Sequence, residues 1–194
     1  MTADTKLRSD ARENRERILI AARDTLAVDP AASLNSIAKA AGVGAGTLYR
    51  HFASREALVL GVYRKEIDAQ VALAPALLAR HPPLEAFRRW CERLVQLGKV
   101  KHGIADLLHA ASTEKDFQET YWPMLGAVRA LMDACQRAGT IHPDANPEDV
   151  LTLVGLLWRI PPTRDGEARA KRILALIFRG LGAPSPGRDG ARPP

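Results

Sequence analysis

The chain has 194 residues, of which 46% are hydrophobic and 5% aromatic, and its formal net charge is +6. This length allows one large domain or two small ones with sizeable apolar cores. Alanine and leucine are abundant and β-branched runs are scarce, a composition that favours an all-α protein. The positive charge is spread along the chain, with 11 Lys/Arg against 8 Asp/Glu in residues 1–66, so charge alone is weak evidence for a polyanionic partner.

Several classes of protein are disfavoured by what the sequence lacks. Cys91 and Cys135 form neither a CxxC pair nor a disulfide framework, so we expect two buried, reduced thiols. No apolar run reaches membrane-spanning length and no signal-peptide core is visible, so we expect a cytoplasmic protein without a membrane partner. There is no nucleophile elbow, Gly-rich phosphate loop or HExxH motif. We therefore expect no catalysis, no cofactor and no metal site.

The N-terminal segment, residues 1–13, is polar and has no helical periodicity. We interpret it as a flexible arm whose basic side chains contact a phosphate backbone or, as the simpler alternative, as a disordered terminus. A first helix is expected over residues 14–28, where apolar residues recur at helical spacing. Asp29 and Pro30 should end it, because the residue before a proline avoids helical angles.

Residues 33–55, SLNSIAKAAGVGAGTLYRHFASR, predict two short helices joined by a tight turn. The first, over 34–41, is capped by the preceding serine hydroxyl and ended by Gly42 in the left-handed conformation. In the second, Leu48 and Phe52 are four residues apart and should face inward. The exposed face of this helix should then carry a hydroxyl, a phenol, a guanidinium and an imidazole. Such a face suits a groove lined by phosphates and base edges. These groups belong to Thr47, Tyr49, Arg50 and His51. The stretch predicts a helix-turn-helix, which together with the first expected helix makes a domain of residues 14–53.

The segment IAKAAGVGAGTLYRHFASREAL resembles the DNA-binding signature of the TetR family of bacterial transcriptional regulators, I-A-x-x-A-G-V-S-x-G-T-L-Y-x-H-F-x-S-K-x-x-L. Two positions depart from that pattern. Gly44 stands where the family usually has Ser, which costs the second helix a side-chain cap, roughly 0.5–1 kcal/mol at most. Ala45 often has a polar counterpart and offers only a methyl group, so direct base readout should be lean. The matching positions are Ile37, Ala38, Ala41, Gly42, Val43, Gly46, Thr47, Leu48, Tyr49, His51, Phe52, Ser54 and Leu58.

The resemblance implies a sequence-specific, DNA-binding transcriptional regulator, commonly a repressor that binds a palindromic operator in double-stranded DNA as a homodimer. Arg55 stands where the family has a lysine that holds a phosphate; an ordinary solvated arginine is the alternative. A different function, a protein-interaction module that retains the fold without reading DNA, is supported only by Gly44 and Ala45. The predicted DNA contacts are Asn35, Ala45, Thr47, Tyr49, Arg50, His51 and Arg55.

The remaining segment, residues 54–181, is expected to form a linker helix and a helical body, giving about nine helices in all. Ser54 should cap the linker helix, and Pro75 should interrupt the chain after it. Pro123 should either start or kink its helix. The tail, residues 182–194, is rich in Pro and Gly and should be disordered. The expected helices are 55–71, 84–101, 103–111, 116–138, 148–160 and 165–181.

The last two expected helices carry more apolar surface than one core absorbs, which is typical of a buried element or an interface. In the resembled family the corresponding pair forms a four-helix bundle with its twofold mate; the alternative is that both helices are simply core. The predicted dimer interface comprises Leu153, Leu157, Leu174 and Phe178.

Aromatic and histidine side chains fall on helices that line the effector cavity in the family, so we expect a small, mostly apolar effector of unknown identity. Core packing is the alternative for each tryptophan. The run RRWCERLVQLGKVKHGIADLL also resembles the SbtR-like class of C-terminal domains in this family. The predicted pocket residues are Phe87, Trp90, His102, His109, Tyr121 and Trp122.

Overall fold

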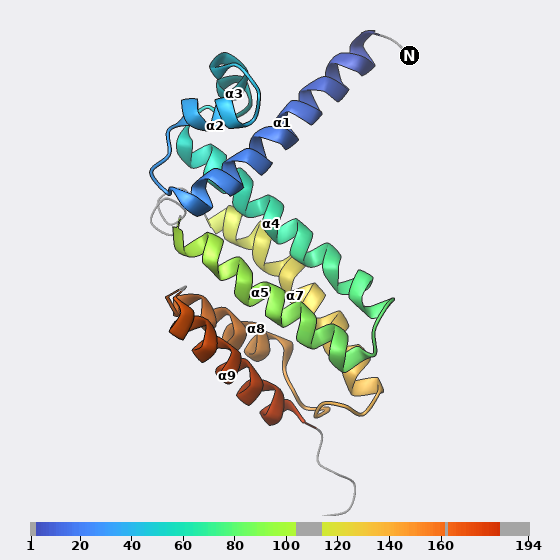
Figure 1. Ribbon diagram of the computed structural model, residues 1–194. Coiled ribbons are helices and arrows are strands. Elements are labelled where there is room, and N and C mark those ends of the chain that lie inside the picture. Colours follow the sequence, from blue (N-terminus) through green and yellow to red (C-terminus); the bar gives the residue numbers. More distant parts are fainter. Residues whose placement is uncertain (1–2, 104–113, 162, 183–194) are drawn as a thin grey trace, which may run out of the picture. The chain divides into compact units, whose positions relative to one another are not determined.

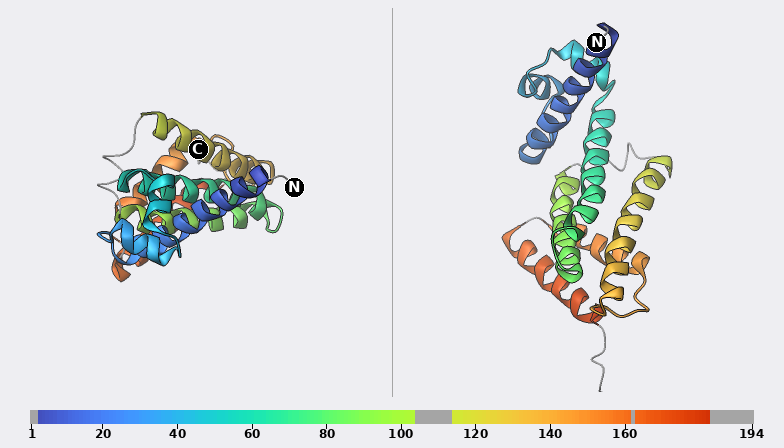
Figure 2. Two further views of the ribbon diagram at one scale, coloured as in Figure 1. Left: turned by 90° about the horizontal axis from the view of Figure 1, so that it is seen from above. Right: turned by 90° about the vertical axis from the view of Figure 1, so that its right-hand side faces the viewer.

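The computed structural model describes residues 3–103, 114–161 and 163–182, and these residues form α-helices without any strand (Figure 1). The all-α prediction is confirmed, and Figure 2 shows the same helices from two further directions. The predicted helix over 103–111 and the predicted tail lie outside the described residues, apart from Gly103 and Gly182. The helices are α1 (Ala3–Val28), α2 (Leu34–Ala40), α3 (Ala45–His51), α4 (Arg55–Leu78), α5 (Pro83–Gly103), α7 (Glu114–Arg137), α8 (Pro147–Leu156) and α9 (Arg164–Leu181), with a 3-10 turn η1 (Leu157–Arg159).

The chain divides into two compact units. One, which we call the head, comprises residues 1–69 and 97–120; the other, the body, comprises residues 70–96 and 121–194. Helices α4, α5 and α7 therefore contribute residues to both units. The predicted domain boundary before the linker helix stays a prediction.

The head is built around an apolar core shared by α1, α2, α3 and the first turns of α4. Gly61 lets α4 approach the core closely, since a Cβ placed there would lie 2.9 Å from Phe52 Cε1 and 3.2 Å from Leu19 Cδ2. The buried core residues are Ile18, Leu19, Ala22, Leu26, Ile37, Ala38, Ala41, Leu48, Phe52, Leu58, Val59 and Val62.

Helix α1 begins at Ala3, so the segment predicted as a non-helical arm is helical from that residue onward. Residues 3–13 are rich in Ala, Lys, Leu, Arg and Glu, which have high helix propensity. Extending an existing helix avoids the cost of nucleation, so these turns need no apolar face. Residues 8–13 are exposed, and the missing periodicity therefore indicated exposure rather than the absence of a helix.

Two prolines lie inside helices. Helix α4 continues through Pro75 to Leu78, and α7 passes through Pro123. A proline removes one intrahelical hydrogen bond, but its own carbonyl still accepts: Ala79 N donates to Pro75 O over 3.0 Å. Buried neighbours, Ala74 beside one proline and Met124 beside the other, anchor both helices in the protein. Tertiary packing thus overrides the interruption predicted at Pro75.

The body has its own core, in which Trp90 forms a reciprocal pair with Gln70. The indole Nε1 donates to Gln70 O, and Gln70 Nε2 donates to Trp90 O, each over 2.9 Å. Cys91 and Cys135 are free and buried, as predicted, and burial raises the pKa of both thiols. Helix α7 was expected to run to residue 138 and ends at Arg137, and Gly139 follows it with a φ of +65°.

The last two helices of the body begin at side-chain caps. Asn146 Oδ1 accepts from Glu148 N at the start of α8, and Thr163 Oγ1 accepts from Gly166 N at the start of α9. The helix predicted over 148–160 is shorter than expected, because η1 replaces its last turn. Trp158 in η1 donates from Nε1 to Leu94 O over 2.7 Å, which ties this turn to α5.

Candidate nucleic-acid interface

The geometry of α2 follows from the residues at its two ends. Ser33 Oγ accepts from Ser36 N over 3.1 Å, which confirms the predicted N-cap. Gly42 has a φ of +65°, and Val43 N donates to Ala38 O over 3.0 Å, the hydrogen bond of a glycine-ended helix. Val43 is half-buried rather than fully buried. These local groups fix where α2 stops and where the turn to α3 begins.

Helix α3 has one buried and one exposed face. Gly44 precedes it and makes no side-chain cap, as predicted. Leu48 points into the head core, whereas the side chain of Tyr49 is 50% exposed and Arg50 is exposed. Thr47 and His51 are half-buried at the edge of the exposed face. Two further predicted DNA contacts, Asn35 on α2 and Ala45 on α3, are also exposed.

Arg50 is oriented by a neighbour on its own helix. Its Nη2 donates to Thr47 Oγ1 over 3.0 Å, so the guanidinium lies along the exposed side of α3. A shallow cavity of about 270 Å³ adjoins this pair and is also lined by His51. Its other wall is Asp10, Ala11 and Asn14, so the N-terminal half of α1 flanks α3. Sequence analysis missed this wall because it treated most of that segment as an arm.

Arg55, at the start of α4, contacts the protein's own backbone. Its Nη1 donates to Ala32 O and its Nη2 donates to Pro30 O, so the guanidinium holds the loop between α1 and α2. Ser54 Oγ accepts from Ala57 N over 3.2 Å, consistent with the predicted cap of α4. Sequence analysis missed the loop contact because the accepting carbonyls lie 23 and 25 positions away and follow no local pattern.

None of the six residues predicted for the effector pocket lines the cavity between α4, α5 and α9, and the predicted pocket stays a prediction. Phe87 and Trp90 are fully buried, and the Trp90 N–H is bonded within the core, which favours the core alternative for both. Tyr121 is half-buried, and Trp122 is 57% exposed with its ring against Tyr121. His102 belongs to α5, but its side chain lies outside the described part of the structure, as does all of His109.

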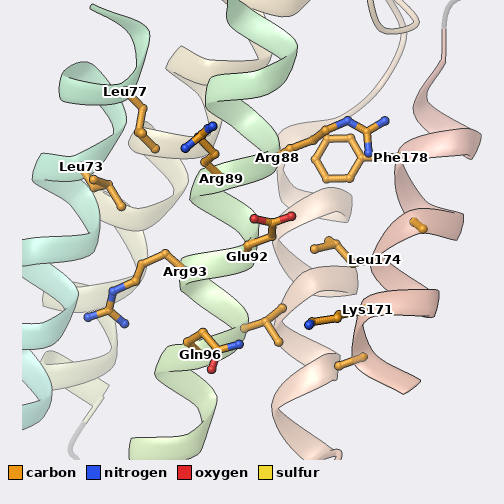
Figure 3. A pocket seen from close by; sticks show the side chains of 13 residues that line it. Leu73, Leu77, Arg88, Arg89, Glu92, Arg93, Gln96, Lys171, Leu174 and Phe178 are labelled. Atoms are coloured by element: carbon orange, nitrogen blue, oxygen red, sulfur yellow. The ribbon is translucent and has the colours of Figure 1, made fainter. Parts of the chain in front are cut away.

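The body's described cavity lies between α4, α5 and α9 and has a volume of about 860 Å³ (Figure 3). Two residues predicted for the dimer interface, Leu174 and Phe178, line this cavity and are buried within the body. Leu157 is buried as well, because η1 turns it inward. Of the predicted dimer residues only Leu153 is exposed, since apolar spacing alone does not show which way a helix faces.

The described residues contain no group of three or more His, Cys, Asp or Glu side chains placed to hold a metal ion. None of the described helices is both long and apolar enough to cross a membrane.

A capped helix, a glycine turn and a second helix with one exposed polar face define a helix-turn-helix protein. The chain belongs to the TetR family of bacterial regulatory proteins, whose family model matches residues 18–62. The model for the C-terminal domain of SbtR-like transcriptional regulators matches residues 82–183. The predicted family resemblance is therefore confirmed in both parts of the chain.

Solved structures and curated proteins resemble the chain to different extents. A TetR transcriptional regulator from Streptomyces coelicolor, SCO0520, is 36% identical with a TM-score of 0.78, over 88% of this chain and 99% of that one. A TetR regulatory protein from Mycobacterium vanbaalenii is 30% identical with a TM-score of 0.74, over 91% and 99%. The HTH-type transcriptional regulator SAR0097 from Staphylococcus aureus is 38% identical over 79 residues, 39% of this chain and 41% of that protein. The match thus spans less than half of that curated relative.

Proposed function

We propose that this protein is a sequence-specific, DNA-binding transcriptional repressor whose α3 enters the major groove of an operator. The observation that carries the proposal is the exposed face of α3, where Tyr49 and the Thr47–Arg50 pair stand opposite the buried Leu48. A short helix with such a face fits a groove lined by phosphates and base edges. Its role is binding rather than catalysis, and it acts where the chromosome is, in the cytoplasm.

The contacts divide into positioning and base reading. Tyr49 and His51 bind phosphates, which fixes α3 on the duplex without selecting a sequence. Arg50 donates to a guanine edge, and Thr47, which already holds its guanidinium, restricts the directions available to it. Asn35 on α2 is the second base-reading candidate, and Ala45 contributes a methyl contact.

The experiment is a gel-shift titration with the intergenic DNA beside the protein's own coding region, repeated over a series of salt concentrations. Arg50→Gln should cost about 1–3 kcal/mol on the preferred site and relax the preference at one base pair. Tyr49→Phe should cost about 1 kcal/mol on every sequence, because only a hydroxyl is lost. Arg129→Gln removes the same charge from an exposed position of α7 in the body and should change little. Equal affinity for all four proteins, or no shift at all, would favour an interaction module instead.

Arg55 can be tested in the same titration. Because its guanidinium holds the α1–α2 loop, we propose that it positions the head and is not a phosphate contact. Arg55→Gln should then lower the melting temperature and the affinity while leaving the salt slope unchanged. Loss of a phosphate contact would instead lower that slope by about 0.9.

We propose that the protein is a homodimer formed through α8 and α9. Leu153 and Leu156 on α8 and Leu176 on α9 are large apolar side chains exposed on the body. Exposed leucines on the last two helices suit a self-complementary twofold contact. Two heads related by a twofold axis would read a palindrome with half-sites about 34–36 Å apart.

Release by a small-molecule effector completes the proposal. An effector displaces a repressor only if it binds more tightly to a conformation that does not fit the operator. A tenfold loss of operator affinity needs about 1.4 kcal/mol of differential binding. The body's cavity is large enough for such a ligand, since ligand sites typically have volumes of about 300–1,000 Å³.

A further inference from the structure

The cavity of the body is an open groove with apolar walls on two sides. Leu73 and Leu77 of α4 form one wall, and Leu174 and Phe178 of α9 form the other, with α5 between them (Figure 3). Phe178 is fixed by an edge contact with Phe87, whose ring centroid is 5.2 Å away. The Leu174 and Phe178 side offers an apolar ring or short chain a surface beside α5.

Charges of mainly one sign line the same groove. Three arginines and Lys171 outnumber the single acid, Glu92, so the lining carries a formal charge of +3 (4 − 1). The Arg88 guanidinium lies over the Phe178 ring, 4.5 Å from its centroid, which orients it and leaves its N–H groups at the ring edge. Among the described residues no carboxylate pairs with Arg88 or Lys171, whereas Arg89 donates to Glu85 over 2.7 Å. The lining arginines are Arg88, Arg89 and Arg93.

The groove lies on a different side of α9 from the proposed dimer face. Leu174 lines the groove, and Leu176 follows it by two residues, about 200° further around an α-helix. Leu176 is exposed, like the leucines of α8, whereas Leu174 is buried. A twofold contact through the exposed leucines therefore leaves the groove open.

We propose that this groove binds a small amphipathic anion, with an apolar ring or short chain against Leu174 and Phe178 and one carboxylate or sulfonate group on Arg88. Charge-assisted hydrogen bonds from a guanidinium suit one such group. Glu92 lies between Arg88 and Lys171 in Figure 3 and disfavours a second anionic group. The proposal extends the proposed function by naming the class of effector, but binding itself does not depend on DNA recognition.

The test compares two dyes with the same rings, anionic anilinonaphthalene sulfonate and uncharged N-phenylnaphthylamine, by fluorescence titration of the full chain without DNA. The sulfonate should bind at one site per chain, and about tenfold more tightly than the neutral dye, as expected for one charge-assisted contact. Decanoate should displace it and decanol should not. Because no DNA is present, a failure here leaves the gel-shift result untouched.

Four variants locate the site, each checked for folding by circular dichroism. Arg88→Gln should weaken the sulfonate about tenfold, Lys171→Gln should weaken it less, and both should leave the neutral dye unchanged. Ala175→Trp, a substitution in the groove lining, should abolish binding of both dyes. Arg129→Gln, outside the groove, should alter neither dye.

Three results would overturn the proposal. The first is equal affinity for the two dyes, and the second is sulfonate binding that Arg88→Gln leaves unchanged. The third is a groove that a second copy of the chain covers. In that case the wild type would bind no dye, and light scattering would show that Ala175→Trp is a monomer.

Discussion

The head and the body stabilise their helices by different means. In the head, α2 and α3 have only seven residues each, and local groups such as the Ser33 hydroxyl and Gly42 define the ends of α2. In the body, α7 continues through Pro123, held by large buried side chains. Isolated helices of seven residues are unstable in water, so α3, which has no side-chain cap, depends on the few side chains that pack beneath it. The helices of the body are longer, and their stability depends on which side of each helix is buried.

The largest expected effect is the difference between substitutions at two neighbouring leucines of the body. Leu157 is 5% exposed and Leu156 is 50% exposed, although both are equally apolar in sequence. Leu157→Asp places an unpaired charge in the core and should lower the free energy of unfolding by about 4 kcal/mol or more. Leu156→Asp should leave the fold intact and convert the proposed dimer into a monomer. Urea unfolding and light scattering measure the two effects.

A contrary outcome of that pair is easily recognised. A folded, monomeric Leu157→Asp protein would mean that η1 forms the partner-facing surface, as its apolar spacing predicted. A dimeric Leu156→Asp protein would remove α8 from the proposed contact. Leu156→Asn, which adds no charge, serves as the matched control and should weaken the dimer less.

The second effect concerns two glycines of the head. Gly61→Ala places a methyl group 2.9 Å from Phe52 Cε1 and should destabilise the head by about 1–3 kcal/mol. Gly46→Ala meets nothing within 4 Å and should stabilise α3 by about 0.5–1 kcal/mol, because alanine restricts the unfolded chain. Thermal unfolding of both proteins measures the difference. Equal shifts of the same sign would show that the Phe52 ring moves aside at little cost.

The third effect is confined to the body, which holds both cysteines. Burial raises the pKa of the Cys91 thiol, so the unfolded chain releases this proton at a lower pH than the folded one. The stability is therefore complete below the unfolded pKa and is lost as the pH rises above it. Between pH 8 and 9.5 we expect a loss of about 1 kcal/mol, measured by urea unfolding. Cys91→Ala should reduce that slope and leave the part that is due to Cys135, whose pKa burial also raises, and an unchanged slope would contradict the assignment.

The sequence predicted a contact well when the residues that make it lie close together in the chain, and poorly when they lie far apart. Ser33, Gly42 and Leu48 act within one or two turns, and the structure confirms their predicted cap, turn and buried side. The contact of Arg55 with the α1–α2 loop joins residues far apart in sequence, and no local pattern encodes it. Phe178 was equally ambiguous, because an apolar residue on a helix packs against its own core or a partner with the same periodicity.

The smallest effects compare the two caps of the helix-turn-helix. Ser33→Ala removes the acceptor for Ser36 N, so α2 should lose about 1 kcal/mol. Gly44 makes no side-chain cap, and Gly44→Ser adds a hydroxyl at the N-cap of α3 in backbone angles that suit one, φ −70° and ψ 149°. Because glycine is itself a tolerable N-cap, the gain should be only a few tenths of a kcal/mol. Amide hydrogen exchange in the first turn of α3 should slow by about twofold in Gly44→Ser, whereas Ser33→Ala should speed exchange in α2 about fivefold. Faster exchange in Gly44→Ser would show that the added side chain competes with the turn instead of capping the helix.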